Sequence, residues 1–473
     1  MQGLQRLFII AIVILLVGLP QFAMAQDGGG QPPSATPAEI IHTVAQGENL
    51  YRIALNYNTT VAAIVALNNL QDPNQIVIGQ QLRIRPGVTT IEQPAVTPEP
   101  VATTPVPPEV QPTDPPTPAD TTGGTAPNVP FAYGVDVEVV GENLDMARVA
   151  ERVVELGASW VKQEIRWEAY ESSKGVIDYA SLDTLIDTLD ATGANILLTV
   201  TTAPSWSHNY IGDGEAPPTN YQDYADFVAA LATRYGDRID AYEIWRQPNL
   251  RQNWNNKPLG GAEYVSMLRL AYAAIKAADT NAIVVTAGLA PTGLNDGTNA
   301  VDDRVFLSQM YQAGVADYSD AIGAHPYGWA NPPDSTCCGN NPVISQWDNH
   351  PSFFFLETLQ DYYAIMLENE DTATFIWVTE FGWGSSDNFP VEVSPDFSFV
   401  EAVSLDEQSQ YTMRAFTLGR TLDYVGPMFI WNLNDCQVYG LVAYQCYWSM
   451  LDPEGNPRPV FLVIRDMINT PQE

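Results

Sequence analysis

Residues 129–473 of this sequence predict a (β/α)8 barrel, the α/β fold in which eight parallel strands close into a cylinder covered by helices. A small βααβ domain is predicted in front of it. Two observations support the barrel. Eight short apolar runs alternate with amphipathic segments, which is the pattern of repeated strand–helix units. Most of these runs are apolar at nearly every position, as expected for parallel strands that are buried on both faces.

The predicted elements of the barrel follow in regular order. The strands are expected at 132–138, 160–165, 195–200, 241–245, 283–287, 321–324, 375–378 and 428–431. The helices are expected at 144–156, 182–189, 221–235, 264–278, 301–313, 354–369, 408–422 and 460–468. A doubly wound open sheet is the alternative fold. The sequence shows no glycine-rich phosphate loop after the first strand, which counts against that alternative.

The composition limits the partners of this chain. Its 473 residues exceed one ordinary domain, and 56 Asp and Glu against 21 Lys and Arg give a formal net charge of −35. Such an excess repels the phosphates of nucleic acids and of anionic membranes. We therefore expect a neutral partner such as a polysaccharide, and no nucleic acid. The alternative is that the acidity serves solubility alone.

The first 25 residues have the organisation of a secretory signal peptide. Arg6 supplies the positive start, and residues 7–19 form an apolar run that is short for a membrane span. Ala23-Met24-Ala25 is a small-x-small cleavage site. An uncleaved anchor is the alternative interpretation. We expect a secreted protein, extracellular or associated with the cell wall, with no membrane contact after cleavage.

Two stretches of low apolar content separate the folded units. Residues 26–38 are rich in Gly, Pro and Gln, and we expect them to be disordered. Residues 87–128 are dominated by Pro, Thr and Val, with five acidic residues and no Lys or Arg. Such a composition builds no core and stays extended. It predicts a linker between a domain at 39–86 and the barrel domain at 129–473.

The block at 39–86 carries a motif of its own, which begins with His42-Thr43-Val44 and closes with a run that ends at Ile84. It resembles a LysM domain over its whole length. The resemblance implies binding of N-acetylglucosamine-containing glycans, such as peptidoglycan or chitin, in a shallow groove between two loops. A purely structural module is the alternative. The implied groove residues are Gly47, Glu48, Asn49, Leu50, Ile76, Val77 and Ile78.

The four cysteines allow three disulfide pairings in an oxidising compartment. Cys436 and Cys446 would close a short loop, and this pairing is preferred. Adjacent Cys337 and Cys338 then form either a vicinal bridge or two free thiols. The sequence has no spaced Cys/His set around them, so we expect neither a zinc site nor any other metal or cofactor.

Polar and aromatic side chains gather at the carboxyl ends of the predicted strands, where (β/α)8 barrels place their sites. Aromatic faces stack on the apolar faces of sugars, while polar groups bond the hydroxyls. The pattern therefore indicates a carbohydrate site. Its candidate residues are Arg166, Trp206, Arg246, Gln247, Asn249, His325, Tyr327, Glu380 and Trp431.

Two of these segments resemble the catalytic motifs of clan A glycoside hydrolases, nearest to the family 39 and family 5 type. Residues 241–249, Ala-Tyr-Glu-Ile-Trp-Arg-Gln-Pro-Asn, match the strand end usually written Trp-Asn-Glu-Pro-Asn. Residues 376–383, Ile-Trp-Val-Thr-Glu-Phe-Gly-Trp, match the nucleophile strand. The resemblance covers nearly all of 131–468 and implies retaining O-glycosyl hydrolysis.

The resemblance gives each candidate a role. Glu380 matches the nucleophile, and His325 and Tyr327 match the pair that holds it. Arg166 matches an arginine that bonds the nucleophile and keeps it ionised. In the alternative interpretation, His325 is an ordinary buried histidine and the tryptophans are core aromatics. The implied substrate contacts are Trp206, Asn249 and Trp431, of which the last forms the floor under the cleaved sugar.

The chain departs from the family at the acid/base position. Gln247 stands where the family has Glu, and Arg246 replaces an Asn that bonds the sugar 2-hydroxyl. Retaining hydrolysis needs two carboxyl groups ~5 Å apart, and an amide cannot transfer a proton. Arg246 either fills the sugar subsite or pairs with Glu380 and silences it.

Three hypotheses follow from this departure. The first is a hydrolase limited to good leaving groups, as in the plant thioglucosidases that also carry Gln at this position. The second is a hydrolase with a relocated acid. The third is a glycan-binding pseudoenzyme that has lost catalysis. The candidates for a relocated acid are Asp136, Glu138, Glu164 and Glu168.

Overall fold

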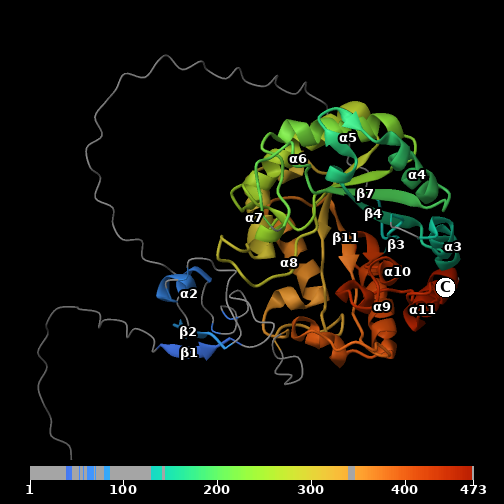
Figure 1. Cartoon of the computed structure of the whole chain (residues 1–473). Coiled ribbons are helices and arrows are strands. Elements are labelled where there is room, and N and C mark those ends of the chain that lie inside the picture. The colour runs from blue at the N-terminus through green and yellow to red at the C-terminus, as the bar shows by residue number, and fades with distance from the viewer. Residues whose placement is uncertain are drawn as a thin grey trace, which may run out of the picture.

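The eight predicted strands close into one parallel barrel in the computed structural model (Figure 1). The described residues are 39–44, 53, 57, 61–68, 70, 79–85, 129–140, 144–212, 214–338 and 347–470. The strand order around the barrel is β10-β11-β12-β3-β4-β7-β8-β9. Its strands are β3 (Tyr133–Asp136), β4 (Trp160–Arg166), β7 (Asn195–Thr201), β8 (Ala241–Ile244), β9 (Ile283–Thr286), β10 (Ala321–Ala324), β11 (Phe375–Phe381) and β12 (Val425–Ile430). The predicted fold class is confirmed.

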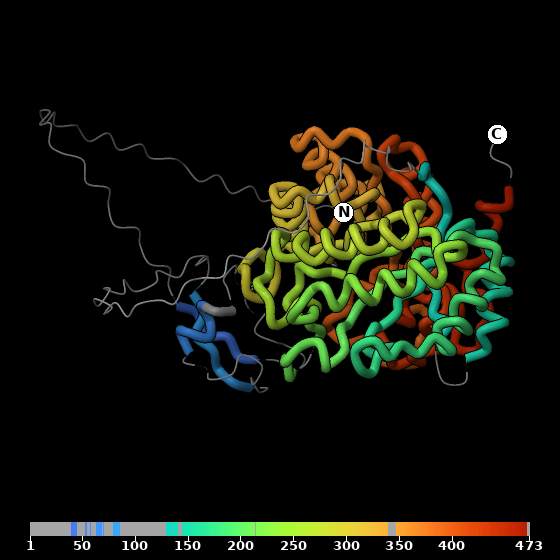
Figure 2. The backbone as a smooth tube through the Cα atoms, turned by 90° about the horizontal axis from the view of Figure 1, so that it is seen from above, coloured from blue at the N-terminus to red at the C-terminus, as the bar shows by residue number. Residues whose placement is uncertain are grey.

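A ring of helices covers the barrel (Figure 2). The covering helices are α3 (Met146–Leu156), α4 (Tyr179–Asp190), α5 (Tyr221–Tyr235), α6 (Gly261–Ala278), α7 (Asp303–Gln312), α8 (Phe355–Glu368), α9 (Leu405–Arg420) and α11 (Pro459–Asn469). Side-chain caps fix several of their starts. Ser404 and Glu407 form a reciprocal capping box at α9, which satisfies backbone N–H groups that would otherwise lack partners.

The sequence misplaced the ends of two strands and missed some smaller elements. Strand β11 runs to Phe381, three residues past its predicted end, because Thr379 and Glu380 continue the strand with side chains that contact groups at the barrel mouth. Strand β12 starts at Val425, before Gly426-Pro427, a pair that normally signals a turn. The missed elements are the hairpin strands β5 (Glu171–Ser173) and β6 (Val176–Ile177) and the short helix α10 (Asp435–Tyr439).

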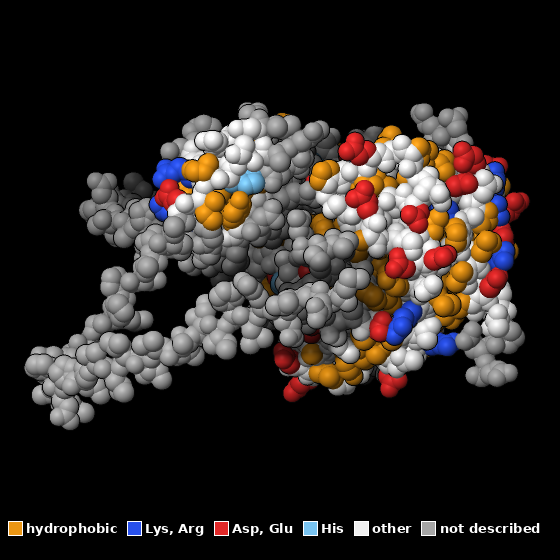
Figure 3. Space-filling model, turned by 90° about the horizontal axis from the view of Figure 1, so that it is seen from below, with side chains coloured by type: hydrophobic (Ala, Val, Ile, Leu, Met, Phe, Trp, Pro, Cys, Tyr) orange, Lys and Arg blue, Asp and Glu red, His pale blue; other side chains and the backbone are white. Residues whose placement is uncertain are grey.

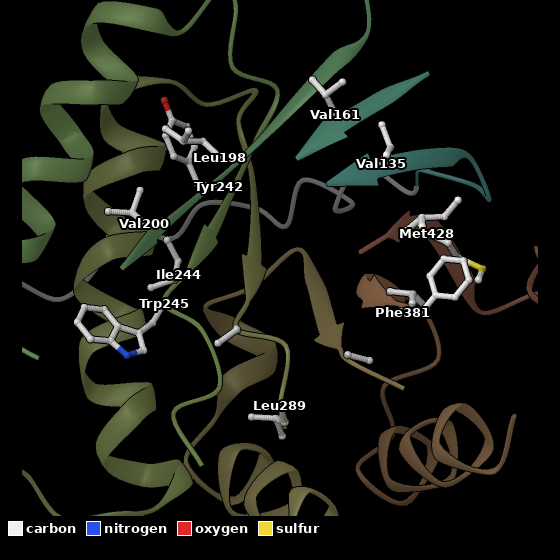
Figure 4. Close-up of a cluster of buried hydrophobic side chains, with 14 of the residues drawn as sticks. Val135, Val161, Leu198, Val200, Tyr242, Ile244, Trp245, Leu289, Phe381 and Met428 are labelled. Atoms are coloured by element: carbon white, nitrogen blue, oxygen red, sulfur yellow. The ribbon is translucent and has the colours of Figure 1, made fainter. Parts of the chain in front are cut away.

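Apolar residues fill both surfaces of the barrel wall. A cluster that includes Trp160, Trp377 and Phe429 is built from the first half of several strands, so it packs the amino-terminal end of the barrel. A larger cluster joins the strands to the helices, and Figure 4 shows part of it, with Leu198 and Val200 projecting from β7. Because the amino-terminal end is packed with large apolar side chains, polar side chains have room only at the carboxyl-terminal end.

Two buried tyrosines bond helices α5 and α6 to the strand ends beneath them. The hydroxyl of Tyr224 donates to the carbonyl of Val200 at 2.7 Å, and that of Tyr264 donates to the carbonyl of Ile244 at 2.8 Å. Tyr264 also accepts the backbone N–H of Ala287. These bonds hold the ends of β7, β8 and β9 in place, and the ends of these strands carry part of the candidate site.

The small domain contains an antiparallel pair, β1 (Ile40–Thr43) and β2 (Gln81–Ile84), and the helix α2 (Val61–Asn68). Its core includes Ile64, Leu82 and Ile84. Asn68 ends α2 and bonds the backbone of β2 in both directions, since its amide donates to the carbonyl of Arg83 and accepts the N–H of Arg83.

Several predictions lie outside the described residues. They are the signal peptide at 1–25, the disordered stretch at 26–38, the linker at 87–128 and the LysM groove residues at 47–50 and 76–78. Within the part of the chain that is described, no helix combines the length and the apolar character needed to cross a membrane. Disulfides join Cys337 to Cys338 and Cys436 to Cys446, so the vicinal bridge is formed.

Candidate active site

Glu380 lies near the end of β11, buried at the mouth of the barrel. The hydroxyl of Tyr327 donates to one of its carboxylate oxygens at 2.9 Å, and the ammonium of Lys162 donates to the other at 2.9 Å. The ring of His325 lies 3.5 Å from the same oxygen that Tyr327 bonds. Both oxygens of this carboxylate are therefore held by fixed donors.

Lys162 is fully buried on β4, where it bonds two carboxylates and lies 3.9 Å from a third, that of Glu243. Its Nζ lies 2.8 Å from Asp136 and 2.9 Å from Glu380. The two carboxylate oxygens bonded to this nitrogen are thus at most about 5.7 Å apart, the sum of these two distances. A separation of ~5 Å is the one that retaining glycosidases use for their two carboxyl groups.

The charges around Glu380 keep it ionised. Burial alone would raise the pKa of this carboxyl. The charges of Lys162 and Arg246 outweigh burial, so the pKa of Glu380 lies below its ordinary value. For Asp136 the balance is the reverse, because burial outweighs the attraction of Lys162 and raises its pKa. The pair therefore contains one carboxylate that is ionised at neutral pH and one that holds its proton more tightly.

Gln247 is bonded into a polar chain that leads away from Glu380. Its amide lies 3.1 Å from His325 Nδ1, and His325 Nε2 lies 3.0 Å from the hydroxyl of Thr379. That hydroxyl donates to the buried Glu243 at 2.7 Å. Burial lowers the pKa of His325 to about 3, so the ring is neutral at pH 7. A neutral ring that accepts from Gln247 on Nδ1 donates from Nε2 to Thr379.

The side chains of Gln247 and Glu380 lie on the same face of the barrel. The amide nitrogen is 3.1 Å from His325 Nδ1, which is 3.5 Å from Glu380 Oε2, so these two atoms are at most about 6.6 Å apart. A side chain at position 247 is therefore close enough to Glu380 for both to contact the same bond of a bound molecule. Its neighbour Gly288 allows this packing, since a Cβ there would lie 2.2 Å from the ring of His325.

The backbone at the end of β8 is strained. Trp245 has φ 71° and Gln247 has φ 45°, both in the left-handed region that non-glycine residues rarely adopt. Thr202, at the end of the neighbouring β7, has φ 51°. Such residues concentrate at functional sites, where the surrounding structure holds them in place. The strain agrees with a site at this end of the barrel.

Charged residues line the half of the mouth formed by β3, β4, β7 and β8, which we call the ionic side. Arg246 lies 3.2 Å from Glu164 and 3.9 Å from Glu215, and Arg166 lies 3.2 Å from Glu215. Burial raises the pKa of Glu215, while Arg246 opposes it. The members of the ionic side are Asp136, Glu138, Glu164, Arg166, Glu215 and Arg246.

Aromatic rings line the half of the mouth formed by β10, β11 and β12, which we call the aromatic side. Trp431 follows β12 and its ring centroid lies 6.0 Å from that of Tyr327. Trp431 also lies 5.4 Å from Trp448 and 6.4 Å from Tyr444. The members of the aromatic side are Tyr327, Phe397, Trp431, Tyr444 and Trp448.

Arg166 does not hold Glu380, so that prediction was wrong. It pairs with Glu168 at 2.7 Å and with Glu215, and Lys162 bonds Glu380 instead. Residues 162 and 166 are on the same strand and, through the alternation of β-structure, on the same face. Lys162 lies deeper in the barrel than Arg166, and from that depth its ammonium bonds Glu380.

Two expected substrate contacts have other roles. Asn249 is fully buried, and its amide bonds the backbone of Ala290 and Val301, so it ties two loops together. Trp206 donates to the carbonyl of Glu171 and lines a separate pocket of about 290 Å³ beside the β5–β6 hairpin. The sequence placed both residues at strand ends correctly, but it did not show which way their side chains point.

The sequence analysis missed Lys162 and Glu215. Lys162 lies in β4, whose seven residues include four polar or charged side chains, so the sequence did not single it out. Glu215 lies in the loop after β7, far in sequence from a strand end. Among the candidates for a relocated acid, Glu164 pairs with Arg246 and the exposed Glu168 pairs with Arg166.

Comparison with known proteins assigns the two folded units. A LysM domain model matches residues 42–85. The chain is similar in structure to a family 39 glycoside hydrolase from the gut symbiont Bacteroides cellulosilyticus WH2, with 20% identity and a TM-score of 0.54 over 72% of this chain and 64% of that protein. It is also similar to a glucosidase from Croceicoccus marinus, with 12% identity and a TM-score of 0.50 over 73% of this chain and 68% of that one.

Asp and Glu are scattered over the visible surface of the barrel, with fewer Lys and Arg among them (Figure 3).

At these identities the likeness to the two solved structures establishes the fold of the barrel. The chain therefore joins a LysM domain to a (β/α)8 barrel with the fold of glycoside hydrolases.

Proposed function

We propose that this protein is a secreted glycan-associated protein whose barrel is a retaining O-glycosyl hydrolase of altered acid–base chemistry. Glu380 is its nucleophile and Gln247 occupies its acid/base position. The observation that carries the proposal is the ionised Glu380, held by Lys162 and Tyr327 with the amide of Gln247 within about 6.6 Å. His325 positions both side chains.

The remaining parts of the chain fit this role. We propose a signal peptide at 1–25, a disordered stretch at 26–38, a linker at 87–128 and a catalytic domain at 129–473. The LysM domain holds the protein to N-acetylglucosamine-containing glycans such as peptidoglycan or chitin. The 56 acidic residues outnumber the 21 basic residues. This negative charge favours a neutral polysaccharide over an anionic polymer as the substrate.

The proposed chemistry follows from the two side chains. A Glu380 oxygen attacks the anomeric carbon and forms a glycosyl ester, while the bond to the leaving oxygen breaks and its electron pair departs with that oxygen. Gln247 offers a hydrogen bond to the leaving oxygen but no proton. Loss of general acid help lowers the rate by about 10²–10⁴-fold, so glycosides that leave as stable anions are the favoured substrates. Asp136, within about 5.7 Å of Glu380, is the best-placed replacement acid.

A second candidate is a glycan-binding pseudoenzyme. It is favoured by Arg246, whose guanidinium lies between two carboxylates of the ionic side, Glu164 and Glu215. By the sequence resemblance, Arg246 stands at the position of an Asn that contacts the sugar in clan A glycoside hydrolases. The barrel would then bind a glycan without cleaving it.

The double change Arg246→Asn and Gln247→Glu separates the two candidates. Restoring the carboxyl group should raise the rate of hydrolysis of an alkyl glycoside by about 10²–10⁴-fold, the usual contribution of acid/base catalysis. Glu380→Gln in the same background is the matched control and should abolish the gain. A double variant that folds and binds glycan but shows no gain would favour the pseudoenzyme.

A further inference from the structure

The loop that follows β12 extends the aromatic side beyond Glu380. The disulfide between Cys436 and Cys446 closes this loop, and both cysteines are buried. Tyr444 lies inside the closed segment and is 43% exposed, whereas most large aromatic side chains of the barrel are buried. A covalent loop closure that holds an exposed ring in place favours a binding role for that ring.

The ring of Tyr444 stacks on one neighbouring ring and remains partly exposed. It stacks on Phe397 with a centroid distance of 4.7 Å and an angle of 7° between the ring planes. Because Phe397 covers one face, the exposed area belongs to the rest of the ring. Tyr444 also lies 6.4 Å from Trp431, which lies 6.0 Å from Tyr327, the residue that bonds Glu380. The four rings form a continuous row that begins at Glu380.

Charged groups of the cleft act on the hydroxyl of Tyr444. Its crowded surroundings raise the pKa of this hydroxyl, and the charges of Arg246 and Glu380 both act on it. The side chain thus offers a partly exposed ring and a hydroxyl group at the end of the row that leads to Glu380. This combination suits a pyranose, whose C–H face packs on a ring and whose hydroxyls bond polar groups.

We infer that Tyr444, backed by Phe397, forms a second sugar subsite beside the one at Glu380, so that the substrate is a glycan chain of two or more sugars. The inference rests on the proposed function. It adds a substrate class, because a site confined to Glu380, Tyr327 and Trp431 would accept simple glycosides equally well.

The test measures how affinity changes with chain length. The full chain would be titrated calorimetrically with a methyl glycoside and with oligosaccharides of two to six units from glucan, xylan, mannan and galactan. These probes contain no N-acetylglucosamine, so the LysM domain does not contribute. Tyr444→Ala should weaken binding of the oligosaccharides by about two- to tenfold, the range of one aromatic contact, and leave the methyl glycoside unchanged. Tyr444→Phe should keep most of the affinity.

Tyr424 provides a matched control. It stacks on Tyr363 with the same 7° angle and precedes β12, at the opposite end of the barrel. Tyr424→Ala should leave all affinities unchanged, and the melting temperatures of the variants show whether they fold. Equal binding of oligosaccharides by the wild type and Tyr444→Ala would overturn the inference alone, as would equal weakening of the methyl glycoside. Failure of the wild type to bind any probe would overturn the proposed function as well.

Discussion

At the barrel mouth, the ionic side carries carboxylates and guanidinium groups, whereas the aromatic side carries rings that pack against one another. The two sides respond differently to change. Removing one member of a buried ion pair leaves an uncompensated charge, which costs several kcal/mol. Removing one ring from a row takes away contact area and leaves the other rings in place. Under the proposed function, chemistry and glycan binding are supported by separate parts of one cleft and can be altered separately.

The largest effect is expected from Lys162→Met, which removes the ammonium shared by Asp136 and Glu380. Two buried carboxylates then lack their cation, so we expect the free energy of unfolding at pH 7 to fall by about 3–5 kcal/mol in urea titrations. The deficit should shrink at acidic pH, because protonated carboxyl groups no longer need the cation.

Lys174 is the control for this variant. It is 60% exposed and pairs with Asp223, so Lys174→Met should leave the free energy of unfolding close to that of the wild type. If both variants lost the same free energy of unfolding, the shared ammonium would not stabilise the ionic side. The proposed difference between the ionic and aromatic sides would then be wrong.

A smaller effect is expected from pH. Burial raises the pKa of Glu138 to about 7, above its ordinary 4.5, and also raises the pKa of Glu215. The folded state therefore holds these protons more tightly than the unfolded chain. The contribution of Glu138 is present below pH 4.5 and is lost as pH rises through about 7. The contribution of Glu380 is lost only as pH falls below its ordinary value, because its pKa is lowered.

The melting temperature should accordingly fall between pH 5 and pH 8, by on the order of 2 °C for each such group. Glu138→Gln should flatten this slope when melting is followed by calorimetry. Tyr444→Phe, on the aromatic side, should leave the slope unchanged. A slope that is the same in the wild type and in Glu138→Gln would contradict the assignment.

The fold was predictable because each strand and helix has its own local pattern, and helix α5 even has the predicted bounds. The core of the site was predictable to the extent that its residues end strands: Gln247, His325, Tyr327 and Glu380 do come together. Lys162 and Glu215 were missed because depth along a strand and the path of a loop depend on tertiary packing. The same limitation explains the wrong role given to Arg166.

The central claim is that Glu380 is an ionised nucleophile which faces an amide in place of an acid. The most direct measurement is peptide mass spectrometry after incubation with activated 2-fluoro glycosides, whose good leaving groups depart without acid help. We predict a covalent glycosyl adduct on Glu380, formed in the wild type and absent in Glu380→Gln. A wild-type protein that binds these glycosides but carries no adduct at Glu380, or carries one on another residue, would contradict the account.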